Sequence, residues 1–327
     1  MTNDQYTIVT GANGYLGSYI CRELISRGQR VIALKYDHYA SVVLDHDLIE
    51  YVRCDIREPV MPQIEPVVRG KQVGAVINAA ALLGSSDYDR NYAVNAKGVE
   101  NLIEFARQAG ISRFIQISSV VVIKTFKGPY GETKLIGQQM VEGSGLDYTV
   151  FIPAMILGPE GLGINRILKN VFRFPFIVPL IGKGAETQHP VFVKDFARYI
   201  VVSARDRKAV NKVYQIAGDR VISFRDLIRL ILRIKGSKRL FISVPASLAR
   251  VLGRFFQLTQ KVPLFTAEHV KGVLQDSNLD TEMIRADLGD SFTPLEAALK
   301  FTLEEIGSDW DSRLKPREEK VIRLRSQ

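Results

Sequence analysis

Three side chains that could transfer protons stand near one another in the sequence: Ser119, Tyr130 and Lys134. Tyr130 and Lys134 are four residues apart, so on a helix they share one face. A free tyrosine has a pKa of about 10, and a nearby ammonium group favours the phenolate and lowers that pKa. Tyr130 can then take a proton from a carbinol or give one to a carbonyl, while Ser119 hydrogen-bonds the same oxygen. The trio predicts acid–base chemistry coupled to hydride transfer with a redox cofactor.

A glycine-rich loop over residues 10–17 reads Thr-Gly-Ala-Asn-Gly-Tyr-Leu-Gly. An apolar strand pattern precedes the loop, and a helical apolar repeat follows it as far as Gly28. Glycines permit a tight turn, so that backbone N–H groups and the positive end of the helix face a pyrophosphate. This context predicts a dinucleotide site formed by Gly11, Asn13, Gly14, Tyr15, Leu16 and Gly17.

Strand and helix patterns alternate along the chain, and the elements that they predict must position these residues. Apolar runs predict strands at 6–10, 31–34, 73–78, 114–118, 148–152 and 212–216. Helical patterns predict helices at 92–109, 134–141 and 192–204, besides the one after the glycine-rich loop. This order predicts an α/β protein with a doubly wound parallel sheet, the Rossmann fold, followed by a smaller and mostly helical substrate domain.

Further motifs follow the loop in a fixed order. The spacing Gly-x-x-Gly-x-x-Gly together with Thr10 resembles the short-chain dehydrogenase/reductase superfamily. Residues 78–81 resemble its Asn-Ala-Ala motif, Asn95 lies in a segment that is similar to its helix motif, and residues 130–134 fit Tyr-x-x-x-Lys. The resemblance covers most of the chain and is close to the extended branch, the NAD-dependent epimerase/dehydratase family.

The resemblance implies cofactor contacts beyond the loop. Asp55 ends a segment where that family contacts adenine, and the counterpart of Lys134 also holds the nicotinamide ribose. The other contacts that it implies are Ile56, Ala79, Ala80, Ala81, Asn95, Ile117, Ser118, Tyr130 and Pro153.

The choice between NAD and NADP depends on the residue that ends the second strand. An acidic side chain there holds the ribose 2′-hydroxyl, whereas a cation accepts a 2′-phosphate. This sequence has Lys35 at that place, with Asp37 two residues later. Lys35 favours NADP, and NAD stays open.

Residues around the trio narrow the reaction. Three valines, 120–122, follow Ser119 where dehydratases and decarboxylases of the family carry an acidic residue, so we do not expect a dehydratase. Only ten residues separate Ser119 from Tyr130, fewer than is usual in the extended family, which implies a shortened rim of the active site. Gln188 stands where nucleotide-sugar epimerases often carry an arginine. The sequence predicts an NAD(P)-dependent oxidoreductase that acts on a small or lipid-like carbinol or carbonyl. The alternatives are a nucleotide-sugar epimerase and a non-enzymatic dinucleotide-binding accessory or sensor protein.

The second half carries apolar stretches and a basic helix. Residues 172–181 and 251–256 indicate either a less polar pocket or a domain core, and 263–270 resemble family members near a respiratory NADH dehydrogenase accessory subunit. An arginine every four residues predicts a helix whose basic face is either solvated or in contact with a membrane surface. These arginines are Arg225, Arg229 and Arg233.

The domains follow from the same patterns. We expect an NAD(P)-binding domain over 1–155 and 189–219, a substrate domain over 156–188 and 220–312, and a charged, partly disordered tail over 313–327.

Composition sets the class of protein. The 327 residues are 46% hydrophobic and 24% charged, with a net charge of +9, as in a globular enzyme with some attraction for anions. The chain has two cysteines, an N-terminus without a signal-peptide core, and no apolar stretch of membrane-spanning length. The four histidines lack metal-ligand spacing. We expect a cytoplasmic protein with a small-molecule substrate, no metal, no nucleic-acid partner and no transmembrane segment; a peripheral membrane contact and a homodimer stay open.

Overall fold

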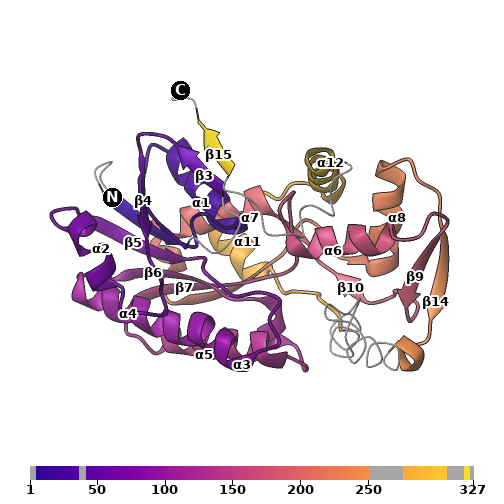
Figure 1. The fold of residues 1–327 in the computed structure, drawn as a ribbon, viewed down its shortest axis with the longest axis horizontal. Helices are drawn as coiled ribbons and strands as arrows, with labels where there is room; N and C mark the ends of the chain where they lie inside the picture. The colour runs from indigo at the N-terminus through magenta and orange to yellow at the C-terminus, as the bar shows by residue number, and fades with distance from the viewer. Residues whose placement is uncertain (1–4, 37–41, 250–274, 308–319, 325–327) are drawn as a thin grey trace.

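The computed structural model describes residues 5–36, 42–249, 275–307 and 320–324. A parallel sheet of seven strands forms its centre (Figure 1), in the order β12-β7-β6-β5-β1-β2-β4. Its strands are β1 (Tyr6–Thr10), β2 (Arg30–Lys35), β4 (Ile49–Arg53), β5 (Val73–Asn78), β6 (Arg113–Ile117), β7 (Asp147–Pro153) and β12 (Lys212–Ile216). The chain reverses its winding direction between β1 and β5, which confirms the doubly wound sheet.

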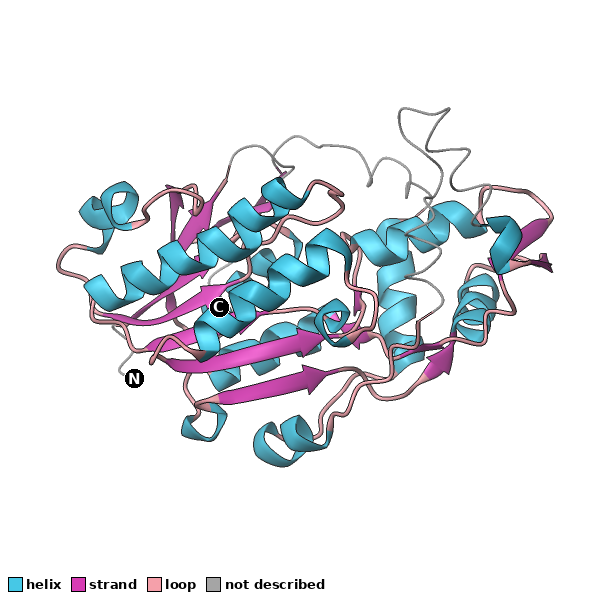
Figure 2. Ribbon diagram, turned by 90° about the horizontal axis from the view of Figure 1, so that it is seen from below, coloured by secondary structure: helices cyan, strands magenta, loops and turns pink. Residues whose placement is uncertain are grey.

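Two layers of helices cover the two faces of this sheet (Figures 1 and 2). Neighbouring residues of one strand point to opposite faces, so Val9 joins the apolar cluster under one layer and Ile8 joins the cluster under the other. The first layer contains α1 (Tyr15–Ser26) and α7 (Val193–Ser203), and the second contains α2 (Met61–Val68), α4 (Gly98–Gln108) and α5 (Gly128–Glu142). Strands buried on both faces explain the continuous apolar runs of the sequence.

The six predicted strands form, and their ends differ from the prediction by at most one residue. The helix predicted over 92–109 differs. It begins earlier as α3 (Tyr88–Tyr92), because the side chain of Asp87 caps it by accepting from the backbone N–H of Arg90. A π-helical turn, η1 (Ala93–Lys97), then leads into α4. The helix predicted over 134–141 is longer at both ends, so Tyr130 lies inside α5.

The C-terminal part packs against one end of this sheet. Helix α8 (Phe224–Ile234) buries Leu227 and Ile231 in the same apolar cluster as Leu299 and Leu303 of α12 (Leu295–Ile306), so the core continues from the sheet into this part. The predicted basic helix is confirmed as α8, while the division into two domains stays a prediction. The remaining elements are η2 (Val120–Ile123), β8 (Ile156–Leu157), α6 (Leu162–Val171), β9 (Ile177–Ile181), β10 (Thr187–Gln188), β11 (Val191–Phe192), η3 (Arg207–Ala209), β13 (Ile222–Ser223), α8 (Phe224–Ile234), β14 (Leu240–Val244), α11 (Glu282–Leu288) and α12 (Leu295–Ile306).

The tail contains a strand that the sequence analysis does not predict. β15 (Lys320–Arg323) pairs in parallel with β3 (Val42–Asp45), and Arg323 forms an ion pair with Asp45 at 2.8 Å. Ile322 and Leu324 pack on the cluster under α1. Residues 320–323 of the charged tail thus form a strand, because Ile322 and Leu324 cover apolar surface.

Residues 251–256 and 263–270, which the sequence analysis singled out, lie outside the described residues. Among the described residues, the structure contains no helix that is both long enough and apolar enough to cross a membrane.

Candidate functional site

The glycine-rich loop joins β1 to the N-terminus of α1. Gly14 is the N-cap residue and offers no side chain, so the N–H groups of the first helical turn have no acceptor within the helix. A Cβ on Gly17 would lie 2.1 Å from the carbonyl oxygen of Gly11, so only glycine lets α1 pack this closely on the turn. Gly11 itself has φ of +60°, a conformation that favours glycine. Unpaired amides at the positive end of a 12-residue helix fit a pyrophosphate.

Two side chains of the loop face the protein. The Asn13 amide donates to the carbonyl of Tyr36 at 3.0 Å and accepts from its N–H at 3.4 Å, which holds the loop beside the end of β2. The Tyr15 hydroxyl is buried near Gly158, where a Cβ would lie 2.3 Å from it. Because both side chains face the protein, we expect Asn13 and Tyr15 to contact the cofactor through their backbone.

A buried hydrogen-bond chain crosses the carboxyl ends of β1, β5 and β6. Thr10 donates to the amide oxygen of Asn78 at 2.6 Å, and the Asn78 amide donates to Gln116 at 2.9 Å. The N–H of Ala80 also donates to Thr10, at 3.2 Å. This chain holds residues 79–81 beside the loop, at the point where the winding direction reverses and α/β sheets bind ligands. The sequence analysis missed Gln116, because only strand pairing brings it to Asn78.

A charged cluster lies at the end of β2. Lys35 is the last residue of this strand and is half-buried. The guanidinium of Arg57 binds the carboxylate of Asp55 at 2.5 Å and donates to the hydroxyl of Tyr36 at 2.6 Å. Asp55, which the resemblance assigns to adenine, is thus held by a cation. Sequence analysis missed Arg57; its spacing of two residues from Asp55 was the available signal. The carbonyl of the neighbouring Ile56 accepts from the Asn101 amide at 2.9 Å.

Helix α5 places Tyr130 and Lys134 one turn apart, as predicted. Ser119 follows β6 and caps η2, where its hydroxyl accepts from the N–H of Val121 at 3.4 Å. The Ser119 hydroxyl also forms a hydrogen bond with the Tyr130 side chain. The structure therefore brings the three predicted side chains together at the end of β6.

The protonation of the trio differs from the sequence-based expectation. Lys134 is only 2% exposed and donates to the carbonyl of Ile117 at 2.5 Å, and burial lowers its pKa to about 8. Burial raises the pKa of Tyr130 to about 12, against the opposing effect of its hydrogen bond with Ser119. Burial thus shifts the pKa of Tyr130 in the direction opposite to the one that the sequence analysis expects from the ammonium of Lys134. With this pKa, Tyr130 keeps its proton at neutral pH.

The π-helical turn η1 packs against α5. A Cβ on Gly137 would lie 2.1 Å from the carbonyl oxygen of Asn95, so this glycine allows the close approach. The Asn95 side chain accepts from the N–H of Leu82 at 3.1 Å and donates to the hydroxyl of Thr133 at 3.3 Å. Asn95 thus fixes the segment after β5 to the helix that carries Tyr130; this is a positioning role beside the predicted cofactor contact.

The other predicted contacts lie at the same edge of the sheet. Ile117 ends β6, Ser118 follows it, and Pro153 ends the neighbouring β7. Ser118 donates its hydroxyl to Gln138 at 2.6 Å, so this side chain is occupied within the protein.

A segment from the C-terminal part contacts the residues between Ser119 and Tyr130, which the sequence analysis did not predict. Gln275 exchanges two hydrogen bonds with the backbone of Phe126, at 3.0 and 3.2 Å, in the loop that leads to α5. Leu279 packs with Ala154 and Ala217 against Val120. The position after Ser119 is thus filled by apolar packing, where a dehydratase would need an acidic side chain.

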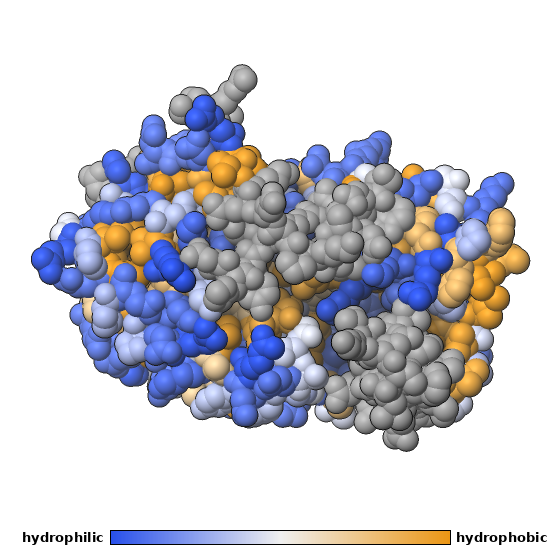
Figure 3. Space-filling model, in the orientation of Figure 1, coloured by the Kyte–Doolittle hydropathy of each residue, from blue (hydrophilic) through white to orange (hydrophobic). Residues whose placement is uncertain are grey.

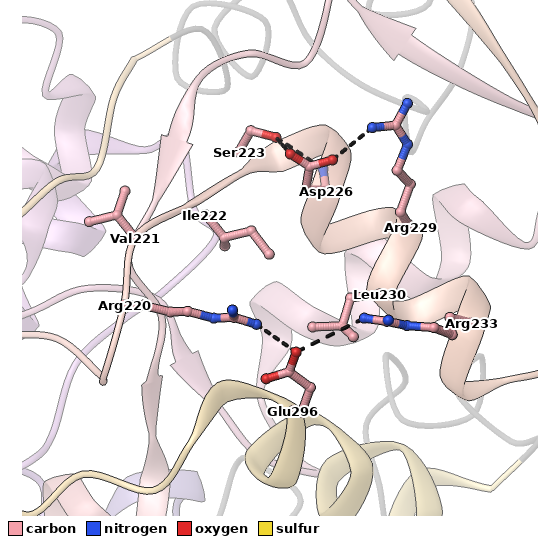
Figure 4. A pocket seen from close by; sticks show the side chains of 9 residues that line it. All are labelled: Arg220, Val221, Ile222, Ser223, Asp226, Arg229, Leu230, Arg233 and Glu296. Atoms are coloured by element: carbon pink, nitrogen blue, oxygen red, sulfur yellow. Dashed lines mark hydrogen bonds and ion pairs between the residues drawn. The ribbon is translucent and has the colours of Figure 1, made fainter.

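A second concave region lies away from the trio (Figure 4). A cavity of about 630 Å³ opens between α8, α12 and the segment around β13. Glu296 points to two arginines across it, to Arg220 at 2.6 Å and to Arg233 at 4.0 Å, and Asp226 pairs with Arg229 at 2.8 Å. The acidic residues that line this cavity thus pair with its arginines, and Ser119, Tyr130 and Lys134 do not line the cavity. The described residues contain no cluster of three metal-ligating side chains.

Comparison with known proteins agrees with this geometry. The chain is 27% identical, over 88% of its length and 77% of the relative's, to the NADH dehydrogenase [ubiquinone] 1 alpha subcomplex subunit 9 of Mus musculus. It is 26% identical to the 2-alkyl-3-oxoalkanoate reductase of Stenotrophomonas maltophilia, over 71% of this chain and 76% of that protein. Its fold is similar to that of an epimerase from Methanothermobacter thermautotrophicus, with a TM-score of 0.76 and 18% identity over 97% of this chain and 96% of the other.

A family profile covers the sheet and the site together. The profile of the NAD dependent epimerase/dehydratase family matches residues 7–217, which include the glycine-rich loop, the trio and all seven strands of the sheet but the first residue of β1. The chain therefore belongs to the NAD-dependent epimerase/dehydratase family.

Proposed function

We propose that this protein is an active NAD(P)-dependent oxidoreductase that interconverts a carbinol and a carbonyl. The observation that carries the proposal is the arrangement of Ser119, Tyr130 and Lys134, with the hydroxyl of Ser119 hydrogen-bonded to Tyr130 and the ammonium of Lys134 buried one turn away. An accessory protein has no need to bury an ammonium at this place, because burial of the charge destabilises the fold.

The bound dinucleotide supplies the hydride, and the side chains move the proton. Tyr130 donates its proton to the substrate oxygen during reduction, since its pKa of about 12 keeps it protonated. Ser119 lies within hydrogen-bond reach of the same hydroxyl and holds the substrate oxygen beside it. Lys134, with a pKa of about 8, supplies a positive charge at the carboxyl edge of β6 that favours the developing phenolate and a ribose hydroxyl.

Apolar side chains near Ser119 support the proposal that the substrate is small or lipid-like. Val120 is packed among apolar residues, and Ile123 and Leu83 are exposed near the ends of β6 and β5. A relative that is named as an alkyl-oxoalkanoate reductase supports the same class. For the cofactor we propose NADP over NAD, because Lys35 and Arg57 both place cations at the end of β2.

Replacing Tyr130 by phenylalanine tests the proposal. The ring and its packing remain, so NADPH affinity in a titration should be unchanged. Reduction of a panel of 3-oxo esters and ketones should fall about a hundred- to ten-thousand-fold, the usual contribution of a general acid. Tyr148→Phe, at the far end of β7, is the matched control and should keep its rate. Near-normal turnover by Tyr130→Phe on a substrate that the wild type reduces would refute the mechanism.

The second candidate is a non-enzymatic dinucleotide-binding accessory protein. It is favoured by the similarity to the NADH dehydrogenase subunit, which covers 88% of this chain. NADPH binding without turnover of any carbonyl, alcohol or UDP-glucose in the panel would favour this candidate. Turnover of UDP-glucose alone would instead favour the nucleotide-sugar epimerase.

A further inference from the structure

The two-stranded sheet at the far end of the C-terminal part is apolar on both faces. β9 and β14 run in parallel, with Leu240 beside Ile177 and Ile242 beside Pro179. The alternate residues, Val178, Leu180 and Phe241, belong to or pack on an apolar cluster with α6 and α8. A sheet that covers a core on one face usually carries polar side chains on the other. This outer face is apolar instead.

The outer face is open to solvent. Phe176, just before β9, is 76% exposed, Leu240 is 74% exposed and Ile242 is 46% exposed, and Phe174 is exposed beside them. Figure 3 shows an apolar surface at the right-hand end of the molecule, where Figure 1 places β9 and β14. We name this surface, formed by Phe174, Phe176, Leu240 and Ile242, the apolar tip. Clustered large apolar side chains at one end of a molecule indicate a contact surface.

Positive charge surrounds the apolar tip. The two segments that form this end, 169–185 and 227–249, contain eight lysines and arginines. Two of these, Arg229 and Arg233, pair with Asp226 and Glu296 at the cavity, which leaves six beside the two strands. Arg173 and Lys238 are exposed in the segments that lead into the two strands. The guanidinium of Arg239 lies 4.7 Å from the ring centroid of Phe172 and donates to the carbonyl of Val171, so it is held at the start of β14. Arg173, Lys238 and Arg239 thus place positive charge next to the apolar side chains.

We infer that the apolar tip docks on the surface of an anionic lipid bilayer. Exposed aromatic and aliphatic side chains enter the boundary between headgroups and acyl chains, while flanking cations contact lipid phosphates. The contact is peripheral, in keeping with the absence of a membrane-spanning helix among the described residues. The inference does not depend on the proposed reaction.

The charges favour a bilayer over a second copy of the chain. A symmetric dimer through the apolar tip would bring the same cations of both copies face to face, and like charges across an interface oppose association. An anionic bilayer instead presents negative charge around an apolar interior, which matches both the cations and the apolar side chains.

Vesicle sedimentation with the full-length protein tests the inference. The vesicles contain phosphatidylcholine alone or phosphatidylcholine mixed with phosphatidylglycerol. We expect binding to the mixed vesicles at least tenfold tighter than to the neutral ones, and weaker binding at high salt. The double variant Phe176→Ser, Leu240→Ser should bind the mixed vesicles at least tenfold more weakly. Its matched control, Met283→Ser with Val321→Ser, removes exposed apolar side chains elsewhere and should bind like the wild type.

Charge variants complete the test. Arg173→Glu with Lys238→Glu should lower binding to the mixed vesicles at least tenfold, whereas Lys97→Glu with Lys208→Glu makes the same change of net charge away from the tip and should lower it less. Equal binding to both kinds of vesicle, or equal losses in test and control variants, would overturn the inference. It would also be overturned by a concentration-dependent dimer in analytical ultracentrifugation that the tip substitutions abolish, without vesicle binding by the wild type.

Discussion

Replacing Lys134 by methionine measures how much the burial of its ammonium group lowers the free energy of unfolding. The ammonium is buried, and its pKa falls from the ordinary 10.5 to about 8. Each factor of ten in a protonation equilibrium corresponds to about 1.4 kcal/mol, so burial of the charged form destabilises the folded state by about 3 kcal/mol at neutral pH. Methionine has a similar length and carries no charge, so this penalty disappears.

One lost hydrogen bond reduces the gain. Lys134 donates to the carbonyl of Ile117, and a typical hydrogen bond contributes about 1 kcal/mol. That carbonyl also accepts from the amide of Gln116 at 3.3 Å, so it keeps a partner in the variant. We therefore expect Lys134→Met to raise the free energy of unfolding by about 2 kcal/mol at pH 7, the difference of these two magnitudes, and to abolish turnover.

The pH dependence identifies the cause. Unfolded Lys134 keeps its proton up to about pH 10.5, whereas the folded side chain loses it near pH 8, so the stability of the wild type rises across this window relative to the variant. Urea unfolding at pH 7 and at pH 10 should show the gap closing. Lys300→Met, at a lysine whose side chain is 69% exposed, is the control and should change stability by less than about 0.5 kcal/mol. A variant that is no more stable than the wild type at pH 7, or a gap that is equal at both pH values, would refute the reasoning.

Further predictions concern the cofactor site. Gly14→Val should weaken cofactor binding at least tenfold in a calorimetric titration while the chain stays folded, because the side chain enters the space of the pyrophosphate; unchanged affinity would show that the loop is not the phosphate site. Gly17→Ala should lower the free energy of unfolding by about 1–3 kcal/mol, since its Cβ meets the carbonyl of Gly11, and a variant as stable as the wild type would disprove that packing. Lys35→Ala should weaken NADP binding about tenfold or more and leave NAD binding unchanged, as expected for a lost charged contact to a 2′-phosphate; equal losses for both cofactors would remove the assignment. Cofactor affinity should fall as the pH rises through about 8, because Lys134 loses its proton there, and a flat profile from pH 6 to 10 would contradict the role of its charge.

The elements that local pattern determines could be predicted from the sequence. Apolar runs predicted six of the seven strands of the sheet to within a residue, because both faces of a parallel sheet are buried, whereas β4 was not predicted. The glycine spacing predicted the loop, since the close contacts at Gly11 and Gly17 exclude any other side chain. The separation of Tyr130 and Lys134 required only that both lie on one helix.

Features that depend on distant contacts could not be predicted. The π-helical turn at Asn95 packs against α5 at Gly137, 42 positions later in the chain. The pKa of Tyr130 depends on how deeply its hydroxyl is buried, which no spacing reveals. Arg57 reaches Tyr36 only because β2 and β4 are neighbours in the sheet. In each case tertiary contact, rather than local preference, determines the outcome.

The pairing of β15 with β3 has a consequence for the order in which the molecule is completed during synthesis. β3 is hydrogen-bonded to the glycine-rich loop, where the N–H of Val42 donates to the carbonyl of Asn13 at 2.9 Å. Its partner strand is made 278 residues after it, as measured between Asp45 and Arg323. Because translation proceeds from the N-terminus, the sheet and its helices can form before residues 320–323 are available to pair with β3. The strand pair beside the glycine-rich loop is thus complete only after residues 320–323 have been synthesised.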